Sequence, residues 1–180
     1  MGLPPSHRYE RTSARRCGHY RSPMRRLLLV LCAGAMLACS NGGAAKPVDA
    51  SFKRLDGSTA SFADYRGTPV VVNFFSSTCV PCVTEMPALE RVHQELGAKV
   101  AFLGMNVQDT VEAARSFLET VKVTWDIGRD PTGSILQTEA DGVGLPTTLL
   151  LDPRGIIVFK HLGAVDVGQL RQALTDNHFT

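Results

Sequence analysis

The sequence predicts an α/β fold, with a central mixed β-sheet flanked by helices and a β-hairpin at its N-terminal end. Two apolar, β-branched runs predict strands buried on both faces: "PVVVNFF" at residues 69–75 and "KVAFLGMNV" at residues 99–107. A segment with apolar residues at helical spacing follows each run, which indicates helices that cover the sheet.

Two hairpins are predicted from turn signals. In "SFKRLDGSTASF", residues 51–62, Asp56 and Gly57 stand between two short extended runs. Near the other end of the chain, "TTLLLD" and "IIVFKHLG" flank the turn "PRG". The segment between the second helix and this hairpin is predicted to be strand or helix, and the pattern leaves the choice open.

Three helices are predicted from apolar residues at helical spacing. Their apolar positions are Leu89, Val92 and Leu96 in the first, Val111, Ala114, Leu118 and Val121 in the second, and Val167, Leu170 and Leu174 in the third. Gly97 is expected to end the first helix, and Pro87 falls inside it. Asp109 is expected to cap the second helix, with Glu112 three residues on, and Asp166 is expected to cap the third.

The charge of the chain is divided unevenly. Residues 1–38 contain seven arginines and one acidic residue, a net charge of +6, whereas residues 39–180 contain 12 basic and 16 acidic residues, a net charge of −4. The part expected to fold therefore has no basic excess with which to bind nucleic acid.

The first 38 residues resemble an export signal. Arg25 and Arg26 precede "LLLVLCAGAMLA", residues 27–38, an uncharged apolar run shorter than the ~20 residues that span a bilayer. The run ends at Cys39 in "AMLACS", which resembles a bacterial lipobox, where the cysteine becomes the lipidated first residue. An ordinary secretory signal cleaved nearby is the alternative.

These features predict three segments: a signal peptide at residues 1–38, the lipidated Cys39 and a flexible tether at 39–50, and one folded domain at 51–180. The expected location is the bacterial periplasm or cell envelope, with the lipid as the membrane anchor. Cys79 and Cys82 are the cysteines left in the domain, and in an oxidising compartment such a pair can form a disulfide.

The pair in "STCVPC" is expected where a strand ends and a helix begins. The sulfur of Cys79 would then face the free N–H groups of the first turn, which favour a thiolate, and Pro81 suits that turn. Cys79 is expected to attack and the inner Cys82 to resolve.

The pair has three other interpretations. Zinc needs about four ligands, and His93 and His161 lack ligand spacing, so no metal site is predicted. A structural disulfide would close a very short loop and constrain the unfolded chain little. A peroxidatic cysteine is conceivable after Thr78, but the usual Pro-x-x-x-Thr-x-x-Cys pattern is absent. Redox exchange is therefore favoured.

The motifs resemble those of the thioredoxin-like proteins of the TlpA/ResA group, which include the reductases of cytochrome c biogenesis. The matching stretches are "VVVNFF…CVPCVTEMP" and "GVGLPTTLLLDPRGIIV", followed by Gly163 and the last helix. The resemblance spans most of residues 51–177 and implies a thioredoxin-like fold. It also implies a cis peptide bond at Leu145–Pro146, which leaves the backbone groups of Leu145 free to pair with a substrate peptide.

Glu85, three residues after Cys82, is a candidate acid/base for the thiols if burial raises its pKa; the alternative is a solvated surface glutamate. The resemblance favours the first reading, since family members carry a glutamate there. Asn73 occupies the place of a buried aspartate in cytoplasmic thioredoxins and is expected to be a hydrogen-bonded strand residue. Thr78 stands where the family usually has an aromatic residue, which removes an apolar platform from the active surface.

The function predicted is that of a membrane-tethered thiol–disulfide oxidoreductase that reduces protein disulfides. The resemblance suggests cytochrome c maturation as its process. Its expected partners are an exported protein with a disulfide and a thiol donor in the membrane. No cofactor beyond the redox-active disulfide is expected, since no flavin or nicotinamide motif is present. The alternatives are a redox-inert thioredoxin-like binding lipoprotein and a copper-delivery protein of similar fold.

Overall fold

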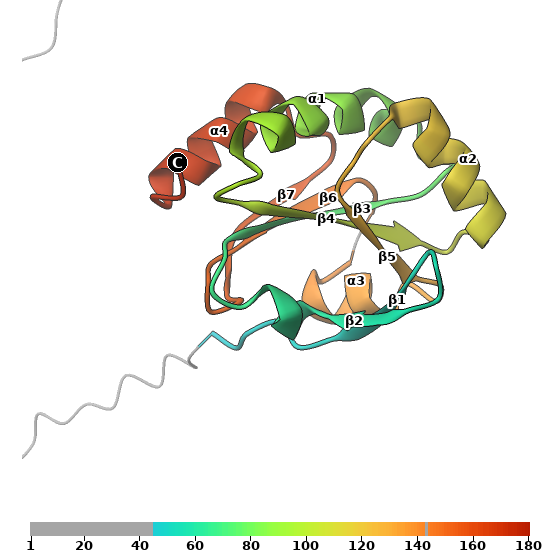
Figure 1. Cartoon of the computed structure of the whole chain (residues 1–180), viewed down its shortest axis with the longest axis horizontal. Coiled ribbons are helices and arrows are strands. Elements are labelled where there is room, and N and C mark those ends of the chain that lie inside the picture. The colour runs from blue at the N-terminus through green and yellow to red at the C-terminus, as the bar shows by residue number, and fades with distance from the viewer. Residues whose placement is uncertain (1–44, 143) are drawn as a thin grey trace, which may run out of the picture. The chain divides into compact units, whose positions relative to one another are not determined.

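The computed structural model describes residues 45–142 and 144–180. In this part of the chain the strands form one seven-stranded sheet in the order β2-β1-β5-β4-β3-β6-β7 (Figure 1). The strands are β1 Ser51–Arg54, β2 Thr59–Ser61, β3 Val70–Phe75, β4 Ala101–Val107, β5 Asp126–Asp130, β6 Thr147–Leu151 and β7 Ile157–Leu162. β3 pairs in parallel with β4 and antiparallel with β6, so the sheet is mixed, as the sequence predicts.

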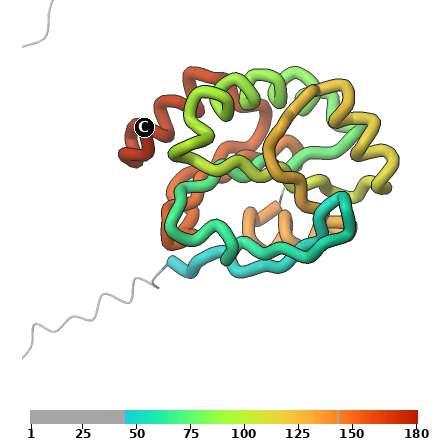
Figure 2. The backbone as a smooth tube through the Cα atoms, in the orientation of Figure 1, coloured from blue at the N-terminus to red at the C-terminus, as the bar shows by residue number. Residues whose placement is uncertain are grey.

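Helices cover both faces of the sheet. They are the 3-10 helix η1 Phe62–Tyr65 and the α-helices α1 Val80–Leu96, α2 Val111–Val121, α3 Ser134–Glu139 and α4 Val167–Asp176. α1, α2 and α4 lie on one face and α3 on the other (Figure 1). The tube in Figure 2 shows α4, in red, beside α1, in green, and the two helices are in contact. The C-terminal part of the chain therefore lies next to the helix that carries the cysteines.

The interior strand β3, between β4 and β6, supplies side chains to two separate cores. Val71 and Phe75 pack in one cluster with buried residues of α1, α2 and α4. Val70, Val72 and Phe74 pack in a second cluster with residues of η1 and α3. All six residues of β3 are buried, which confirms the prediction of a strand covered on both faces.

Both predicted hairpins are present. β1 pairs with β2 around the turn at Asp56 and Gly57, and β6 pairs with β7 around the "PRG" turn. Contacts with the domain begin before β1, because Val48 is buried and its backbone N–H donates to the carbonyl oxygen of Gly155 over 2.9 Å.

The helix ends agree with the sequence in two cases and differ in one. α1 ends before Gly97, and the Asp166 carboxylate caps α4 by accepting from the backbone N–H of Gln169 over 2.8 Å. The prediction that Asp109 caps α2 is wrong. Thr110 does so instead, with its hydroxyl accepting from the N–H of Ala113 over 3.1 Å, and the Asp109 carboxylate bonds elsewhere.

The segment that the pattern left open contains both a strand and a helix, β5 and α3. The letters of β5, "DIGRD", carry no apolar run, and its pairing with β4 and β1 defines it as a strand. Gly128 is required there. A Cβ atom at this position would lie 2.5 Å from a ring carbon of Phe52 and 2.7 Å from the sulfur of Met105.

The predicted signal peptide at residues 1–38 and the anchor at Cys39 lie outside the described residues, so the three-segment division stays a prediction. Within the part described, the structure contains no helix with the length and apolar character needed to cross a bilayer.

Candidate active site

Cys79 and Cys82 form a disulfide at the N-terminus of α1, with their Cα atoms 5.3 Å apart. Cys79 is the N-cap residue, and Pro81 lies in the first turn, where its missing N–H leaves no intrahelical bond unmade. The first cysteine therefore faces the positive end of the helix dipole, as the sequence predicts.

The two cysteines differ in exposure. Cys82 is fully buried among core residues, whereas Cys79 is partly exposed at the edge of the same cluster. Two apolar side chains of the first turn face solvent, Val80 with 78% of its surface exposed and Val83 with 40%. An incoming disulfide can reach Cys79 over this apolar surface but has no path to Cys82.

Glu85 is buried, with 3% of its surface exposed. It lies one turn after Cys82 on the same face of α1, where residues three apart are neighbours. Its Oε2 accepts from the backbone N–H of Val165 over 2.6 Å, and its Oε1 accepts from the Asn73 side chain over 2.5 Å. Burial raises the pKa of Glu85 to about 7, and these two hydrogen bonds to the ionised form oppose the rise.

The Asn73 amide joins three elements. From β3, its Nδ2 donates to Glu85 of α1 and to the hydroxyl of Thr148 on β6, the latter over 3.0 Å. Its Oδ1 is buried and has no hydrogen-bond partner within the described residues. Asn73 is therefore the hydrogen-bonded strand residue that the sequence predicts, and it also touches the carboxylate beside the cysteines.

The peptide bond Leu145–Pro146 is cis, as the resemblance implies. Thr147 pairs with Phe74 near the end of β3, so Pro146 lies close to the point where the chain leaves the sheet toward Cys79. Leu145 packs against the cluster that contains Cys82. The carbonyl oxygen of Pro146 accepts from Gly163, whereas the described part of the chain supplies no hydrogen bond to the backbone of Leu145.

Sequence reasoning missed the function of Asp109 in the segment before the cysteines. Its carboxylate accepts from the backbone N–H of Ser77 over 2.6 Å and from the Ser77 hydroxyl over 2.8 Å. The partners are 32 residues apart, so no local pattern reveals the contact. The polar Asn106 in the apolar run "KVAFLGMNV" is the one signal in the sequence, and its Nδ2 also donates to Asp109, over 2.6 Å.

A hollow of about 520 Å³ opens beside Glu85. It is lined by Thr84, Glu85, Ala88, Arg91 and residues 164–168. Among the residues with described side chains, no group of three or more His, Cys, Asp or Glu side chains is arranged to hold a metal ion.

Comparisons with known proteins bear on this site. A profile of the AhpC/TSA family matches residues 43–160. The thioredoxin-like protein YneN of Bacillus subtilis (strain 168) is 32% identical over 129 residues, which cover 70% of this chain and 75% of that protein. The thiol-disulfide oxidoreductase ResA of Geobacillus thermodenitrificans (strain NG80-2) is 32% identical over 124 residues, 67% of this chain and 69% of that protein.

A solved structure shares the fold. A DsbF homologue from Corynebacterium diphtheriae superposes with a TM-score of 0.67 at 28% identity, over 75% of this chain and 88% of that chain. The sheet, the Cys-x-x-Cys disulfide at the start of α1 and these relatives agree. The chain belongs to the AhpC/TSA family of thioredoxin-like proteins, and it is a thiol–disulfide oxidoreductase of the ResA type.

Proposed function

We propose that the chain is a membrane-tethered, extracytoplasmic reductase of protein disulfides, in which Cys79 attacks, Cys82 resolves and Glu85 moves the proton. The observation that carries this proposal is the buried Glu85 one helical turn from Cys82, with its pKa raised to about 7. An acid/base works best when its pKa lies near the working pH.

The first step uses the exposed cysteine. In the reduced protein, the Cys79 thiolate attacks one sulfur of the substrate disulfide. A mixed disulfide forms between Cys79 and the substrate, and the other substrate sulfur leaves as a thiolate that takes a proton from solvent. The partial exposure of Cys79 and its place at the helix N-terminus support this role.

The second step uses the buried cysteine. The Cys82 thiol gives its proton to the Glu85 carboxylate, and the Cys82 thiolate attacks the sulfur of Cys79. The mixed disulfide breaks, the second substrate sulfur leaves as a thiolate that takes a proton from solvent, and the Cys79–Cys82 disulfide forms. Two electrons have passed to the substrate, and the proton on Glu85 leaves through the hollow that this residue lines.

The substrate is proposed to bind at the cis-proline segment and the apolar surface around it. The backbone of Leu145 is proposed to pair with an extended substrate peptide, by strand addition. Val80, Val83 and Leu162 are exposed apolar residues that could contact such a peptide. Leu162 belongs to this surface because its Cδ1 lies 3.6 Å from where a Cβ of Gly144 would be.

The proposed direction of electron flow is supported by the charges next to the pair in the sequence. A strongly oxidising disulfide needs a reduced form stabilised by a low thiolate pKa. No Lys, Arg or His stands between or beside the cysteines, and Glu85 is an acid. The helix N-terminus alone favours the thiolate, which suits a reductant that receives electrons from a membrane thiol donor.

The anchor and the location rest on the sequence. Cys39 is proposed to carry the lipid, and the protein is proposed to act in the periplasm or cell envelope, on a narrow set of exported proteins. The resemblance to reductases of cytochrome c biogenesis makes an oxidised Cys-x-x-Cys-His peptide, the haem-attachment motif, the first substrate to test.

Insulin reduction by the pre-reduced full-length protein tests the activity, with Cys79→Ser as the inactive control. An oxidised Cys-x-x-Cys-His peptide and a scrambled peptide with the same disulfide measure substrate preference. We expect wild-type protein to reduce disulfides and to become oxidised at Cys79 and Cys82. Wild-type turnover no greater than that of Cys79→Ser would point to the redox-inert binding module instead.

A further inference from the structure

The segment between β3 and the first cysteine is polar where the family usually has an aromatic residue. It reads Ser76-Ser77-Thr78, and Thr78 is exposed. A hydroxyl-rich stretch has little apolar surface to bury, so packing cannot hold it in place. Hydrogen bonds must hold it instead, and the backbone N–H of Cys79 bonds the carbonyl oxygen of Ser76 within it, over 3.2 Å.

Asp109, which lies outside this segment, holds it in place through Ser77. Its two carboxylate oxygens each take a hydrogen bond from Ser77, one from the backbone N–H and one from the hydroxyl. Hydrogen bonds to an ionised acceptor are about twice as strong as those between neutral groups. The two bonds therefore fix both the backbone and the side chain of Ser77, two residues before Cys79.

Asp109 is itself held in place by residues of the neighbouring strands. Asn106, which is buried on β4, donates to the Asp109 carboxylate, and Arg129 on β5 donates to the Asp109 backbone oxygen over 3.1 Å. Gln108, just before Asp109, has φ of 57°, a conformation uncommon outside glycine, and its N–H bonds Asp130 over 3.1 Å. These contacts in the turn after β4 hold the Asp109 carboxylate next to Ser77.

We propose that Asp109 is a positioning residue for Cys79, which fixes the segment 76–78 through Ser77 and holds a negative charge at Ser77, two residues before the thiol that attacks. This inference rests on the proposed role of Cys79 as the attacking thiol. A nearby anion disfavours a thiolate, so Asp109 keeps Cys79 from becoming the low-pKa thiol of a strong oxidant.

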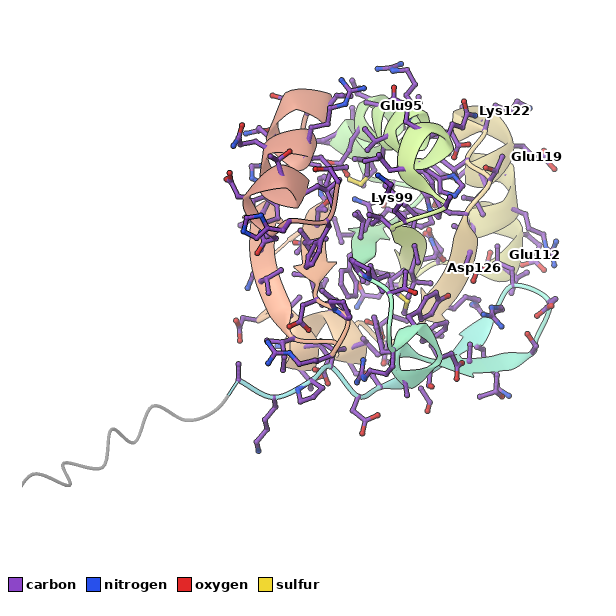
Figure 3. All side chains as sticks on the ribbon, turned by 60° about the vertical axis from the view of Figure 1, so that its left-hand side comes forward. Glu95, Lys99, Glu112, Glu119, Lys122 and Asp126 are labelled. Atoms are coloured by element: carbon purple, nitrogen blue, oxygen red, sulfur yellow. A yellow bond between two sulfur atoms is a disulfide. The ribbon has the colours of Figure 1, made fainter. Side chains whose placement is uncertain are left out.

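The other charged groups around the segment do not replace Asp109. Arg129 bonds the backbone of Asp109 and not its carboxylate, and Glu112 of α2 lies on the outer side of its helix (Figure 3). Glu85 of α1 is bonded to Asn73 and Val165, away from Ser77. Asp109 is therefore the carboxylate whose removal reports on this segment.

The test is the pH profile of Cys79 alkylation by iodoacetamide in the full-length protein with Cys82→Ser, read at Cys79 by peptide mass spectrometry. Asp109→Asn keeps the size of the side chain and removes its charge. We expect the midpoint to move to lower pH, by enough to raise the alkylation rate at pH 7 about three- to tenfold, which corresponds to roughly 0.5 to 1 pKa unit.

Asp56→Asn is the matched control, because Asp56 accepts the same two kinds of bond, from the backbone N–H and hydroxyl of Ser58, in the distant β1–β2 turn. Its profile should equal that of the parent. A profile in Asp109→Asn that also equals the parent would overturn the proposal. This readout needs only a free Cys79 thiol, so it stands even if the protein fails to reduce insulin.

A second variant covers the case in which Asp109→Asn does not fold. Ser77→Ala removes the hydroxyl bond and leaves the charge, so amide hydrogen exchange at residue 77 and Cys79, whose N–H groups are hydrogen-bonded, should quicken while the alkylation midpoint stays in place. Unchanged exchange at both amides would refute the positioning role.

Discussion

The Asn73 side chain donates a hydrogen bond of 2.5 Å to Glu85, and both residues are buried beside Cys82. A neutral amide on β3 thus donates to the carboxylate, and this hydrogen bond favours the charged form of Glu85. Burial works the other way and dominates, which leaves the pKa of Glu85 at about 7. At neutral pH the residue can both hold and release a proton.

Replacing Glu85 with Gln should leave the fold intact and slow disulfide exchange, since an amide cannot take the proton of Cys82. The pH profile of Cys79 alkylation should shift as well. Stopped-flow exchange with a small disulfide measures the first effect, and iodoacetamide alkylation measures the second, each across pH 5–9. Glu95→Gln is the control on the same helix, because Glu95 is exposed and bonds Arg171 at the surface. If the Glu85→Gln and wild-type profiles coincide, Glu85 has no role in proton transfer.

Glu85 should also make stability depend on pH. Its pKa is raised in the folded state, so the folded protein binds this proton more tightly than the unfolded chain does. The favourable contribution is complete below the unfolded pKa of 4.5 and is lost as pH rises through about 7. The full change is about 3 kcal/mol, at 1.36 kcal/mol per pKa unit.

Urea unfolding of the oxidised protein at pH 4.5 and pH 8 tests this dependence. The free energy of unfolding should fall across this range by about 3 kcal/mol more in wild-type protein than in Glu85→Gln. The lowered pKa values of Glu90 and Asp152 act equally in both proteins and cancel in the difference. Parallel stability curves would contradict a raised pKa for Glu85.

The unequal exposure of the cysteines predicts which variant traps a substrate. Cys82→Ser should accumulate a mixed disulfide with the substrate at Cys79, because the resolving thiol is gone. Cys79→Ser should accumulate none, since Cys82 is fully buried. Non-reducing electrophoresis after mixing with an oxidised peptide distinguishes the two. Equal trapping by both variants would mean that Cys82 is reached directly.

The reduction potential of the Cys79–Cys82 pair should be that of a reductant. No Lys, Arg or His is adjacent to the cysteines in the sequence, and the helix N-terminus is the feature that favours the Cys79 thiolate, so we expect the reduced form not to be strongly stabilised. Equilibration with glutathione buffers measures the potential, and we expect a value well below the about −120 mV of strongly oxidising periplasmic proteins. A value near −120 mV would overturn the assignment as a reductase and leave the oxidoreductase class standing.

The proposed lipid anchor at Cys39 is tested by identifying the N-terminus of the mature protein. Mass spectrometry of the protein expressed in a bacterial host should find Cys39 as the first residue, carrying lipid, and Cys39→Ser should move the protein from the membrane fraction to the soluble envelope fraction. A mature N-terminus beyond Cys39 without modification would exclude lipid anchoring.

The sequence predicts those features that depend on the residues of a single segment. The apolar run of β3 predicts burial on both faces, and the two cysteines predict a disulfide at a helix N-terminus. β5 could not be predicted with equal ease, because its pairing with β1 and β4 makes it a strand despite three charged letters in five. Propensity is overridden there by tertiary pairing.

The site shows the same division. Asp109 and Thr110 are adjacent and both residue types cap helices, so local pattern could not separate them. The true partner of Asp109 is Ser77, which the fold brings near from another strand end. The burial of Glu85 likewise depends on residues that are far away along the chain, and so the sequence left a surface glutamate open as the alternative.

The bond from the Val165 N–H to Glu85 spans 80 positions and ties the start of the C-terminal helix segment to the first helix. A nonsense codon or a proteolytic clip just after His161 would spare β3, both cysteines and the cis-proline segment. It would also remove the segment that shields Glu85 from water, and the pKa of the Glu85 carboxyl would return to its ordinary value. The tail of this protein is thus a component of its acid–base chemistry, and truncation would damage the proton step while the sulfur pair stays in the sequence.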